Sequence, residues 1–473
     1  MMLYKGYELT VGLEVHVELK TESKIYCSCP TAFGDAPNTN CCPVCMGMPG
    51  ALPVLNRKVP AYAAKAGFAL NCRVSEHSGQ DRKNYFYPDL PKGYQISQYE
   101  RPLCADGYLD IETASGSKRV EITRIHIEED AGKLIHGEDG EVLIDCNRCG
   151  VPLIEIVTAP VLCSAEEAKT FLQKLRTVLL YLEISDCKMN EGSMRCDVNL
   201  SVHRPGTPLG QRTEIKNLNS FAFVAKAIEY EYKRQVDLAE QGCPILFETM
   251  RFDEKSGRTE SMRQKESAKD YRFFPDPDLP SVFLTRAELE EIRKDLPLLP
   301  HERTALYRER YGISDYDCSR ITSEKERADY FEAAAEQCNA HKILANLVME
   351  ELSLEGARIT PSQMAQIATL LQEGRINTAT ARKVIADLAG KEETLVSAYV
   401  FEKNLWQITD KETLRVFVKE ALAENPTAIR DFGLGKKNAS KVLVGFVMKK
   451  TAGRADAVLV EALVLEALEV AGK

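Results

Sequence analysis

The 473-residue sequence predicts an α+β fold, in which a strand-rich N-terminal part precedes helical units. Residues 11–19 and 120–130 alternate apolar and polar side chains, which is typical of half-buried strands. Beyond Pro280, helical periodicities broken by Gly and Pro dominate. We therefore expect two or three domains, with a boundary at 290–300 and a further helix-rich unit beginning near residues 398–410.

The composition is that of a soluble globular protein, with 44% apolar and 28% charged residues. The net charge of −9 gives no general attraction to nucleic acid, so any such contact needs local basic surface. The N-terminus lacks an apolar signal segment, and no run of 18 apolar residues occurs, which predicts a cytoplasmic protein. In that compartment, fifteen cysteines indicate metal ligands and buried thiols rather than disulfides.

The first predicted strand, residues 11–19, has one apolar and one ionisable face. Glu14, His16 and Glu18 share the second face. Two carboxylates and an imidazole this close together repel or titrate unusually unless a cation lies among them, which suits a divalent metal site. A solvated strand face is the alternative interpretation.

Two close cysteine pairs follow that strand. Cys27 and Cys29 are separated by twelve residues from Cys42 and Cys45. Four thiolates at this spacing can bind one tetrahedral Zn²⁺, with Cys41 as a spare ligand. Free or redox-active thiols are the alternative.

Two segments, residues 81–94 and 263–275, mix basic and aromatic side chains. Rings stack on bases while Arg and Lys neutralise phosphate, so this pattern suits nucleic-acid contact. Aromatic loops packed under a neighbouring sheet would look similar. Near the C-terminus, residues 425–454 carry seven basic residues against one acid, which predicts either a phosphate-binding face or a solvated one.

The strand predicted at residues 120–130 ends in three acids, Glu128, Glu129 and Asp130. They predict either a site for a hard cation or an acidic turn in solvent. Glu155 stands in the apolar run of residues 153–157, which reads as a buried strand. A buried carboxylate needs a metal, a cleft or a cation, and Arg148 is one available partner.

Local helix and strand signals fill the remaining N-terminal part. Ser164 to Glu167 is a capping box before a helix that extends to about residue 182, and Thr285 to Glu288 is a second one. Strands are expected at 194–203 and 214–216, followed by a long helix from about Ser220. No P-loop, strand-linked G-x-G-x-x-G, H-E-x-x-H or nucleophile triad is present, so ATP use needs a non-standard site and any hydrolytic step belongs to another chain.

Taken together, seven motifs resemble the GatB family, the B subunits of the tRNA-dependent amidotransferase. They occur in the family's order: GLEVH at 12–16, the paired cysteines, RIHIEEDAGK at 124–133, NRCGVPLIEIVT at 147–158, EGSMRCDVN at 191–199, EIKNLNSF at 214–221 and RQKESAKDYRFFPDPDLP at 263–280. The resemblance implies a mainly antiparallel-sheet catalytic cradle domain with a zinc knuckle at residues 1–293. An all-α helical domain at 294–400 and a small helical tail at 401–473 that binds tRNA would follow.

The resemblance also implies a reaction. A partner amidase, the A subunit, hydrolyses glutamine to ammonia, and a small C subunit completes the heterotrimer. The B subunit uses ATP and Mg²⁺ to phosphorylate the side-chain carboxylate of Glu-tRNA(Gln) or Asp-tRNA(Asn), and ammonia then displaces phosphate. A zinc-stabilised tRNA-binding scaffold without catalysis is the alternative.

The matched motifs carry the family's site residues onto this chain. Glu14, His16, Glu128, Glu129 and Glu155 would form the phosphoryl-transfer region. His16, Glu129 and Glu155 are assigned to the cation, although the residues alone leave open whether Glu128 or Glu129 is the ligand. The resemblance assigns cofactor binding to Asp197, Glu214 and Lys216, and structural zinc to Cys27, Cys29, Cys42 and Cys45.

Overall fold

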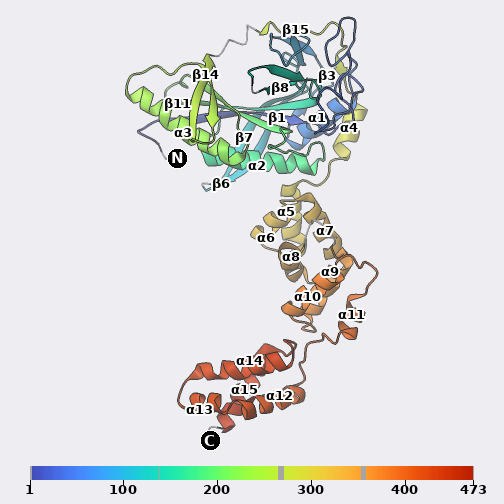
Figure 1. Ribbon diagram of the computed structural model, residues 1–473, viewed down its shortest axis with the longest axis vertical. Helices are drawn as coiled ribbons and strands as arrows, with labels where there is room; N and C mark the ends of the chain where they lie inside the picture. The colour runs from blue at the N-terminus through green and yellow to red at the C-terminus, as the bar shows by residue number, and fades with distance from the viewer. Residues whose placement is uncertain (1–2, 115, 138, 265–270, 353–357, 472–473) are drawn as a thin grey trace. The chain divides into compact units, whose positions relative to one another are not determined.

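The structure is a computed structural model that describes residues 3–114, 116–137, 139–264, 271–352 and 358–471. These residues form two compact units, Met1–Leu299 and Pro300–Lys473 (Figure 1). Residues 265–270 of the RQKESAKDYRFFPDPDLP motif lie outside the described part. Among the described helices, none combines the length and the apolar character needed to cross a bilayer.

Within its described residues, the first unit is built on a nine-stranded sheet of order β14-β13-β12-β11-β1-β10-β7-β6-β2. Neighbouring strands run antiparallel, except for the parallel pair β12 and β13. This sheet, together with the helices, confirms the predicted combination of α and β structure. The strands are β1 (Glu8–Glu18), β2 (Arg73–Val74), β6 (Cys104–Thr113), β7 (Gly116–Glu129), β10 (Pro152–Thr158), β11 (Met194–His203), β12 (Thr213–Lys216), β13 (Glu248–Asp253) and β14 (Arg258–Gln264).

The apolar face of the sheet packs against helices. On β1, Val11, Leu13, Val15 and Val17 are all buried, as the alternation predicts. The helices are α1 (Lys58–Ala69), α2 (Ala165–Tyr181) and α3 (Phe221–Glu240), and Figure 1 shows α2 and α3 along one side of the sheet. The polar face of β1, with Glu14, His16 and Glu18, is therefore directed away from this core.

The helix starts follow local signals. The Ser164 hydroxyl accepts a hydrogen bond from the backbone N–H of Glu167 at the start of α2, and Ser220 caps α3 in the same way. Thr285 and Glu288 form the reciprocal capping box of α4 (Arg286–Lys294). In α2 the Glu167 carboxylate instead accepts from the backbone N–H of Cys163, one residue before the cap.

Short strands bring the two basic-aromatic segments together. β15 (Phe274–Pro275) pairs with β4 (Asp81–Asn84), which pairs with β5 (Tyr94–Ser97); β16 (Val282–Phe283) pairs with β3 (His77–Ser78). Arg82 donates to Asp276 and Asp278 at 2.8 Å each. Tyr99 and Phe273 stack with ring centroids 4.3 Å apart. In the described residues, these segments therefore pack against one another.

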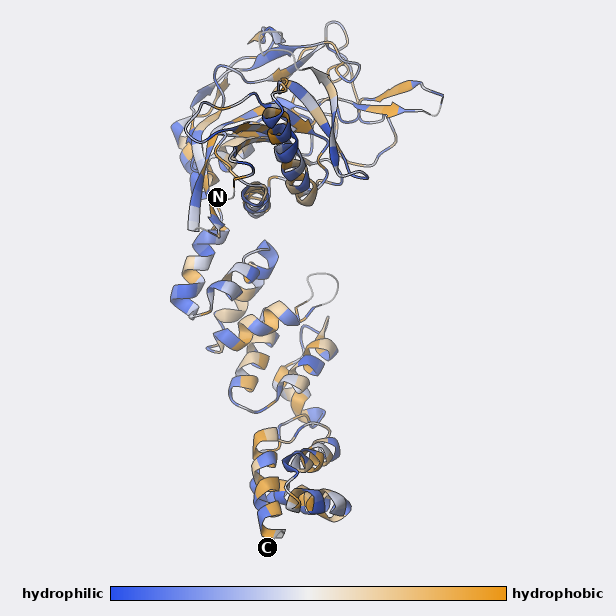
Figure 2. Ribbon diagram, turned by 90° about the vertical axis from the view of Figure 1, so that its left-hand side faces the viewer, coloured by the Kyte–Doolittle hydropathy of each residue, from blue (hydrophilic) through white to orange (hydrophobic). Residues whose placement is uncertain are grey.

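The hairpin of β8 (Lys133–His136) and β9 (Val142–Asp145) exposes apolar side chains, including Leu143 and Ile144 (Figure 2). A two-stranded hairpin has little stability of its own. Its base is held by Asn38, whose side-chain amide donates to the Ile144 carbonyl at 2.9 Å and whose side-chain oxygen accepts from the backbone N–H of Cys146 at 2.8 Å.

The described part of the second unit is helical. Within it, α12, α14 and α15 share a buried apolar cluster that includes Leu414, Leu443, Val447 and Val460. The helices are α5 (Pro300–Tyr311), α6 (Asp315–Ile321), α7 (Lys325–Ala335), α8 (His341–Glu350), α9 (Pro361–Gln372), α10 (Thr378–Leu388), α11 (Val396–Glu402), α12 (Lys411–Glu424), α13 (Pro426–Gly433), α14 (Ser440–Lys450) and α15 (Ala457–Ala471).

A buried carboxylate on α3 ties that helix to the sheet. Glu231 is fully buried and accepts hydrogen bonds from Arg234, Gln235, Thr213 and Thr259. Glu231→Ala would leave these donors without their acceptor, so we expect the free energy of unfolding to fall by about 3 kcal/mol. Urea unfolding followed by circular dichroism measures the change.

The matched control is Glu229→Ala. Glu229 is exposed on the same helix, so this variant should stay within about 0.5 kcal/mol of the wild type. Equal stability of the two variants would show that the Glu231 network adds nothing to folding.

Candidate catalytic site and metal centres

Ionisable side chains from four strands meet on the polar face of the sheet. His16 on β1 lies opposite Glu155 on β10 and Arg195 on β11, and Glu155 lies opposite His126 on β7. Residues directly opposite one another in neighbouring strands point to the same face. The register alone therefore places Arg195, His16, Glu155 and His126 in one row across the sheet.

The two histidines of this row contact its Glu155 and also Glu128, which lies beside the row on β7. His16 Nε2 lies 3.4 Å from Glu128 Oε1 and 3.4 Å from Glu155 Oε2. His126 Nε2 lies 3.3 Å from the same Glu155 oxygen and 3.6 Å from Glu128 Oε2. Ser97 on β5 donates a hydrogen bond to Glu128 at 3.1 Å. One ligand atom each from His16, Glu128 and Glu155 lie within 4.8 Å of one another, which fits a divalent cation.

Burial and mutual charge interactions shift the pKa values of His16, Glu128 and Glu155. Desolvation alone would lower the pKa of His16, but the Glu155 and Glu128 carboxylates raise it to about 10. Burial would raise the pKa of Glu155, yet His126 and His16 hold it well below its usual range, and the two histidines lower the pKa of Glu128 in the same way. These mutual interactions favour the charged forms of Glu128, Glu155 and His16.

The structure distinguishes the two neighbouring acids on β7. Glu128 joins His16 and Glu155, whereas Glu129, which the sequence interpretation assigned to the cation, points elsewhere because side chains alternate along a strand. The Glu129 carboxylate accepts from Lys92 and from the backbone N–H of Ile96, the latter at 2.9 Å. Glu129 thus pairs with the Lys92 side chain and lies outside the group of His16, Glu128 and Glu155.

Glu155 faces two histidines, whereas the sequence interpretation named Arg148 as one available partner. Arg148 donates to the carbonyls of Ala131 and Gly132 at 2.9 and 2.8 Å, and the histidines occupy the place foreseen for it. Sequence reasoning did not include His126 among the site residues. The signal that finds it is its alternation with Glu128 on the same strand face.

A second acidic group adjoins the first across the sheet. Ligand oxygens of Glu14, Asp197 and Glu214 lie within 4.8 Å of one another. Lys216 donates to Asp197 and lies 3.5 Å from Glu214, and these two acids raise its pKa against the effect of burial. The structure therefore brings Asp197, Glu214 and Lys216, which the sequence interpretation assigned to cofactor binding, together with Glu14 on the polar face of β1.

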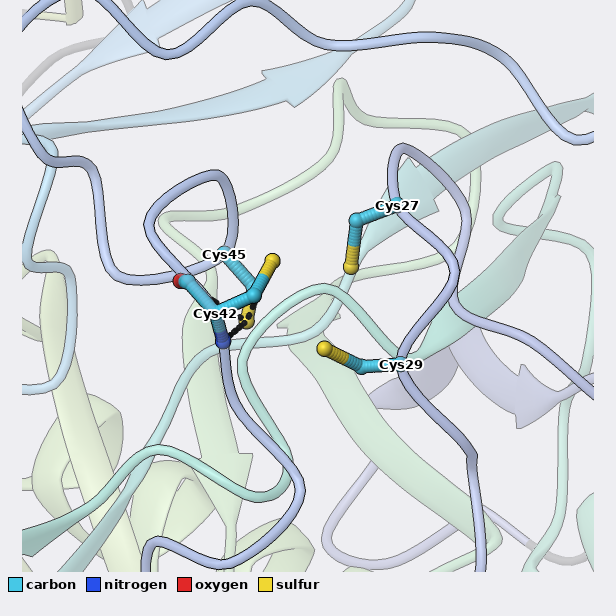
Figure 3. Close-up of side chains that lie close together, drawn as sticks. All are labelled: Cys27, Cys29, Cys42 and Cys45. Atoms are coloured by element: carbon cyan, nitrogen blue, oxygen red, sulfur yellow. Dashed lines mark hydrogen bonds between the residues drawn. The ribbon is translucent and has the colours of Figure 1, made fainter.

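The four paired cysteines converge as their spacing predicts (Figure 3). Their sulfurs lie within 4.8 Å of one another, and those of Cys42 and Cys45 are 4.0 Å apart. A tetrahedral zinc with Zn–S bonds of about 2.3 Å needs sulfurs about 3.8 Å apart, so the donor set fits that ion. Cys41 lies outside this group, with its sulfur 3.2 Å from the Asn38 carbonyl.

A buried lysine supports the thiolate form of this cluster. Lys24 is fully buried, with its Nζ atom 3.5 Å from Cys45 Sγ. A hydrogen bond from Cys27, the backbone N–H of Cys42 and the Lys24 charge lower the pKa of Cys45 to about 4, although burial opposes this. The thiolate is the form that binds a metal.

Comparison with known proteins gives the same identification over nearly the whole chain. The family model described as the GatB/GatE catalytic domain matches residues 9–290, and that of the GatB domain matches residues 327–468. The B subunit of aspartyl/glutamyl-tRNA(Asn/Gln) amidotransferase from Caldicellulosiruptor bescii is 49% identical over 480 residues, covering 98% of this chain and 99% of the relative. The protein of the same name from Thermoanaerobacter pseudethanolicus is 48% identical over 474 residues, with the same two shares covered. The chain therefore belongs to the GatB family, which confirms the resemblance drawn from its motifs.

Proposed function

We propose that this chain is the component of a tRNA-dependent amidotransferase that activates and amidates the amino acid on misacylated Glu-tRNA(Gln), Asp-tRNA(Asn) or both. Family membership supports the reaction class. The observation that carries the proposal to particular residues is the group of His16, Glu128 and Glu155 on the polar face of the sheet.

The reaction needs activation because a carboxylate is a poor acyl donor. A side-chain carboxylate oxygen attacks the γ-phosphorus of ATP, the bond to the bridging oxygen breaks, and ADP leaves. Ammonia then attacks the carbonyl carbon of the acyl phosphate, and inorganic phosphate leaves with the pair of electrons of the C–O bond. One ATP is used for each amide formed, and catalysis consists of positioning and charge stabilisation.

The residues of the polar face divide this work. His16, Glu128 and Glu155 would hold Mg²⁺, which shields the charge that builds up between nucleotide and carboxylate. His126 contacts both Glu155 and Glu128 and so fixes the direction in which their oxygens point. Glu14, Asp197, Glu214 and Lys216 lie beside this group and would bind the nucleotide end of the substrate, through a further cation or directly.

Zinc and the remaining parts of the chain complete the proposal. Zn²⁺ on Cys27, Cys29, Cys42 and Cys45 would close the loop after β1. We assign the catalytic cradle to residues 1–293, a helical domain to 294–400 and a tRNA-binding tail to 401–473. The partners would be a glutamine-hydrolysing A subunit and a small C subunit, in the cytoplasm.

Formation of glutaminyl-tRNA tests this function. The complex with its A and C partners would receive Glu-tRNA(Gln), glutamine and Mg²⁺, with and without ATP. We expect amidated tRNA only when ATP is present, together with one ADP per product. Amidation at the same rate without ATP would overturn the phosphoryl-transfer role proposed for the sheet.

A further inference from the structure

The polar face of the sheet is strongly acidic, which creates a problem for any substrate that carries phosphates. Glu14, Glu18, Glu128, Glu155 and Asp197 all lie on this face. A polyphosphate brought close to these carboxylates is repelled unless cations offset their charge. Divalent ions can supply part of that charge, and the chain's own cations must supply the rest.

Several basic side chains beside this face are already engaged by acids. Arg195 donates to Asp130 at 2.6 Å, and Arg148 lies 3.6 Å from the same carboxylate. Lys216 is held by Asp197. Each of these cations is largely neutralised by its partner and has little charge left for a substrate.

Arg124 differs from these cations. It belongs to the same face of β7 as His126 and Glu128, two residues away from His126 along the strand. Across the sheet it lies opposite Val157 on β10 and Ala105 on β6, so its direct neighbours offer no carboxylate. Its Nε atom, like that of Arg195, is buried and makes no hydrogen bond within the described residues, but Arg195 also donates to Asp130.

A buried guanidinium nitrogen without an acceptor is costly, and an acceptor atom on a bound ligand would remove that cost. Two residues along a strand correspond to about 7 Å, which the length of an arginine side chain can span. The Arg124 guanidinium is therefore within reach of a group bound between His16, Glu128 and Glu155. Its planar set of donors matches the oxygens of a phosphate.

We infer that Arg124 binds the phosphoryl group that ATP transfers, and so offsets its charge beside the acidic cation site. This inference rests on the proposed function and adds a binding residue to it. Arg124 touches the nucleotide phosphates and takes no proton.

The test is equilibrium binding of two nucleotides to the assembled complex in the presence of Mg²⁺. The probes are ADP and the non-hydrolysable analogue adenosine 5′-(β,γ-imido)triphosphate, which retains a γ-phosphate. In Arg124→Gln we expect the affinity for the analogue to fall about 10- to 100-fold, because a hydrogen-bonded charge pair is lost. Affinity for ADP should change less, and Arg124→Lys should recover part of the loss because it keeps the charge without the paired donors.

Arg119→Gln is the matched control, since Arg119 is an exposed arginine on the same strand that pairs with Asp110. It should bind both nucleotides like the wild type. Equal loss for ADP and the analogue would overturn the assignment of Arg124 to the transferred phosphoryl group, because ADP lacks that group. Unchanged affinity for both in Arg124→Gln would overturn the inference, and if that variant fails to fold, unchanged affinity in Arg124→Lys does so. A wild-type complex that binds neither nucleotide would instead overturn the proposed function.

Discussion

Glu155→Gln in the assembled complex is expected to lower the rate of amidation about 100- to 1,000-fold while tRNA affinity stays within about twofold. The substitution keeps the shape of the side chain but removes the charge that His16 and His126 face at 3.4 and 3.3 Å. A neutral amide binds a hard divalent cation far more weakly, and loss of one preorganised electrostatic contact costs a rate factor of this size. Single-turnover amidation and filter binding of Glu-tRNA(Gln) measure the two quantities.

Glu121→Gln provides the control for this substitution. Glu121 lies on β7, the strand that pairs with β10, but it is exposed and lies outside the row of site residues, so amidation should stay at the wild-type rate. A Glu155→Gln complex that folds normally and still amidates at that rate would contradict the site assignment. The acidic group would then be structural, as in the alternative of a tRNA-binding scaffold.

Cys42→Ser is expected to weaken zinc binding by more than about 100-fold and to lower the thermal stability of the first unit. Cys42 and Cys45 lie in the connection between β1 and α1, and the cluster of four sulfurs joins them to Cys27 and Cys29 in the segment that follows β1. Removing one thiolate of four breaks the tetrahedral set, which costs more than loss of a supporting hydrogen bond does. Metal content per chain and the unfolding temperature, with and without a chelator, are the measurements.

Cys243→Ser is the matched control, because Cys243 is exposed and lies outside the cluster. It should retain one zinc per chain and the wild-type unfolding temperature. If the reduced wild-type protein carries no zinc and a chelator leaves its unfolding temperature unchanged, the four cysteines are free or redox-active thiols instead.

The features that depend on residues close together in the sequence could be predicted from the sequence. Alternation separates the buried Val15 and Val17 from His16, and the Ser164 and Thr285 caps start α2 and α4 where expected. The cysteine spacing likewise brings four sulfurs together. Each of these features is decided within a few residues or by a short loop.

Features that depend on strand register could not be predicted in this way. The choice between Glu128 and Glu129 requires knowing which side chains of β7 point to the same face of the sheet as Glu155 on β10. The pairing of Glu155 with His126 decides this, because it places His126 and Glu128 on that face. Alternation puts Glu128 and His126 on one face of the strand, but no local signal says that Glu155 and His16 lie on that face too. Arg148 is a plausible partner in sequence, yet the chain turns it toward the Ala131 and Gly132 carbonyls.

The position of β1 in the sheet has a consequence during synthesis of the chain. β1 ends at Glu18, but its two neighbours are β10, which ends at Thr158, and β11, which ends at His203. The edge of β1 that pairs with β10 therefore stays open on the ribosome until Thr158 has been translated, and the edge that pairs with β11 stays open until His203 has been translated. Strands left open in this way pair readily with other chains. The nascent protein should thus depend on chaperones until β11 emerges, and chains truncated before His203 should aggregate.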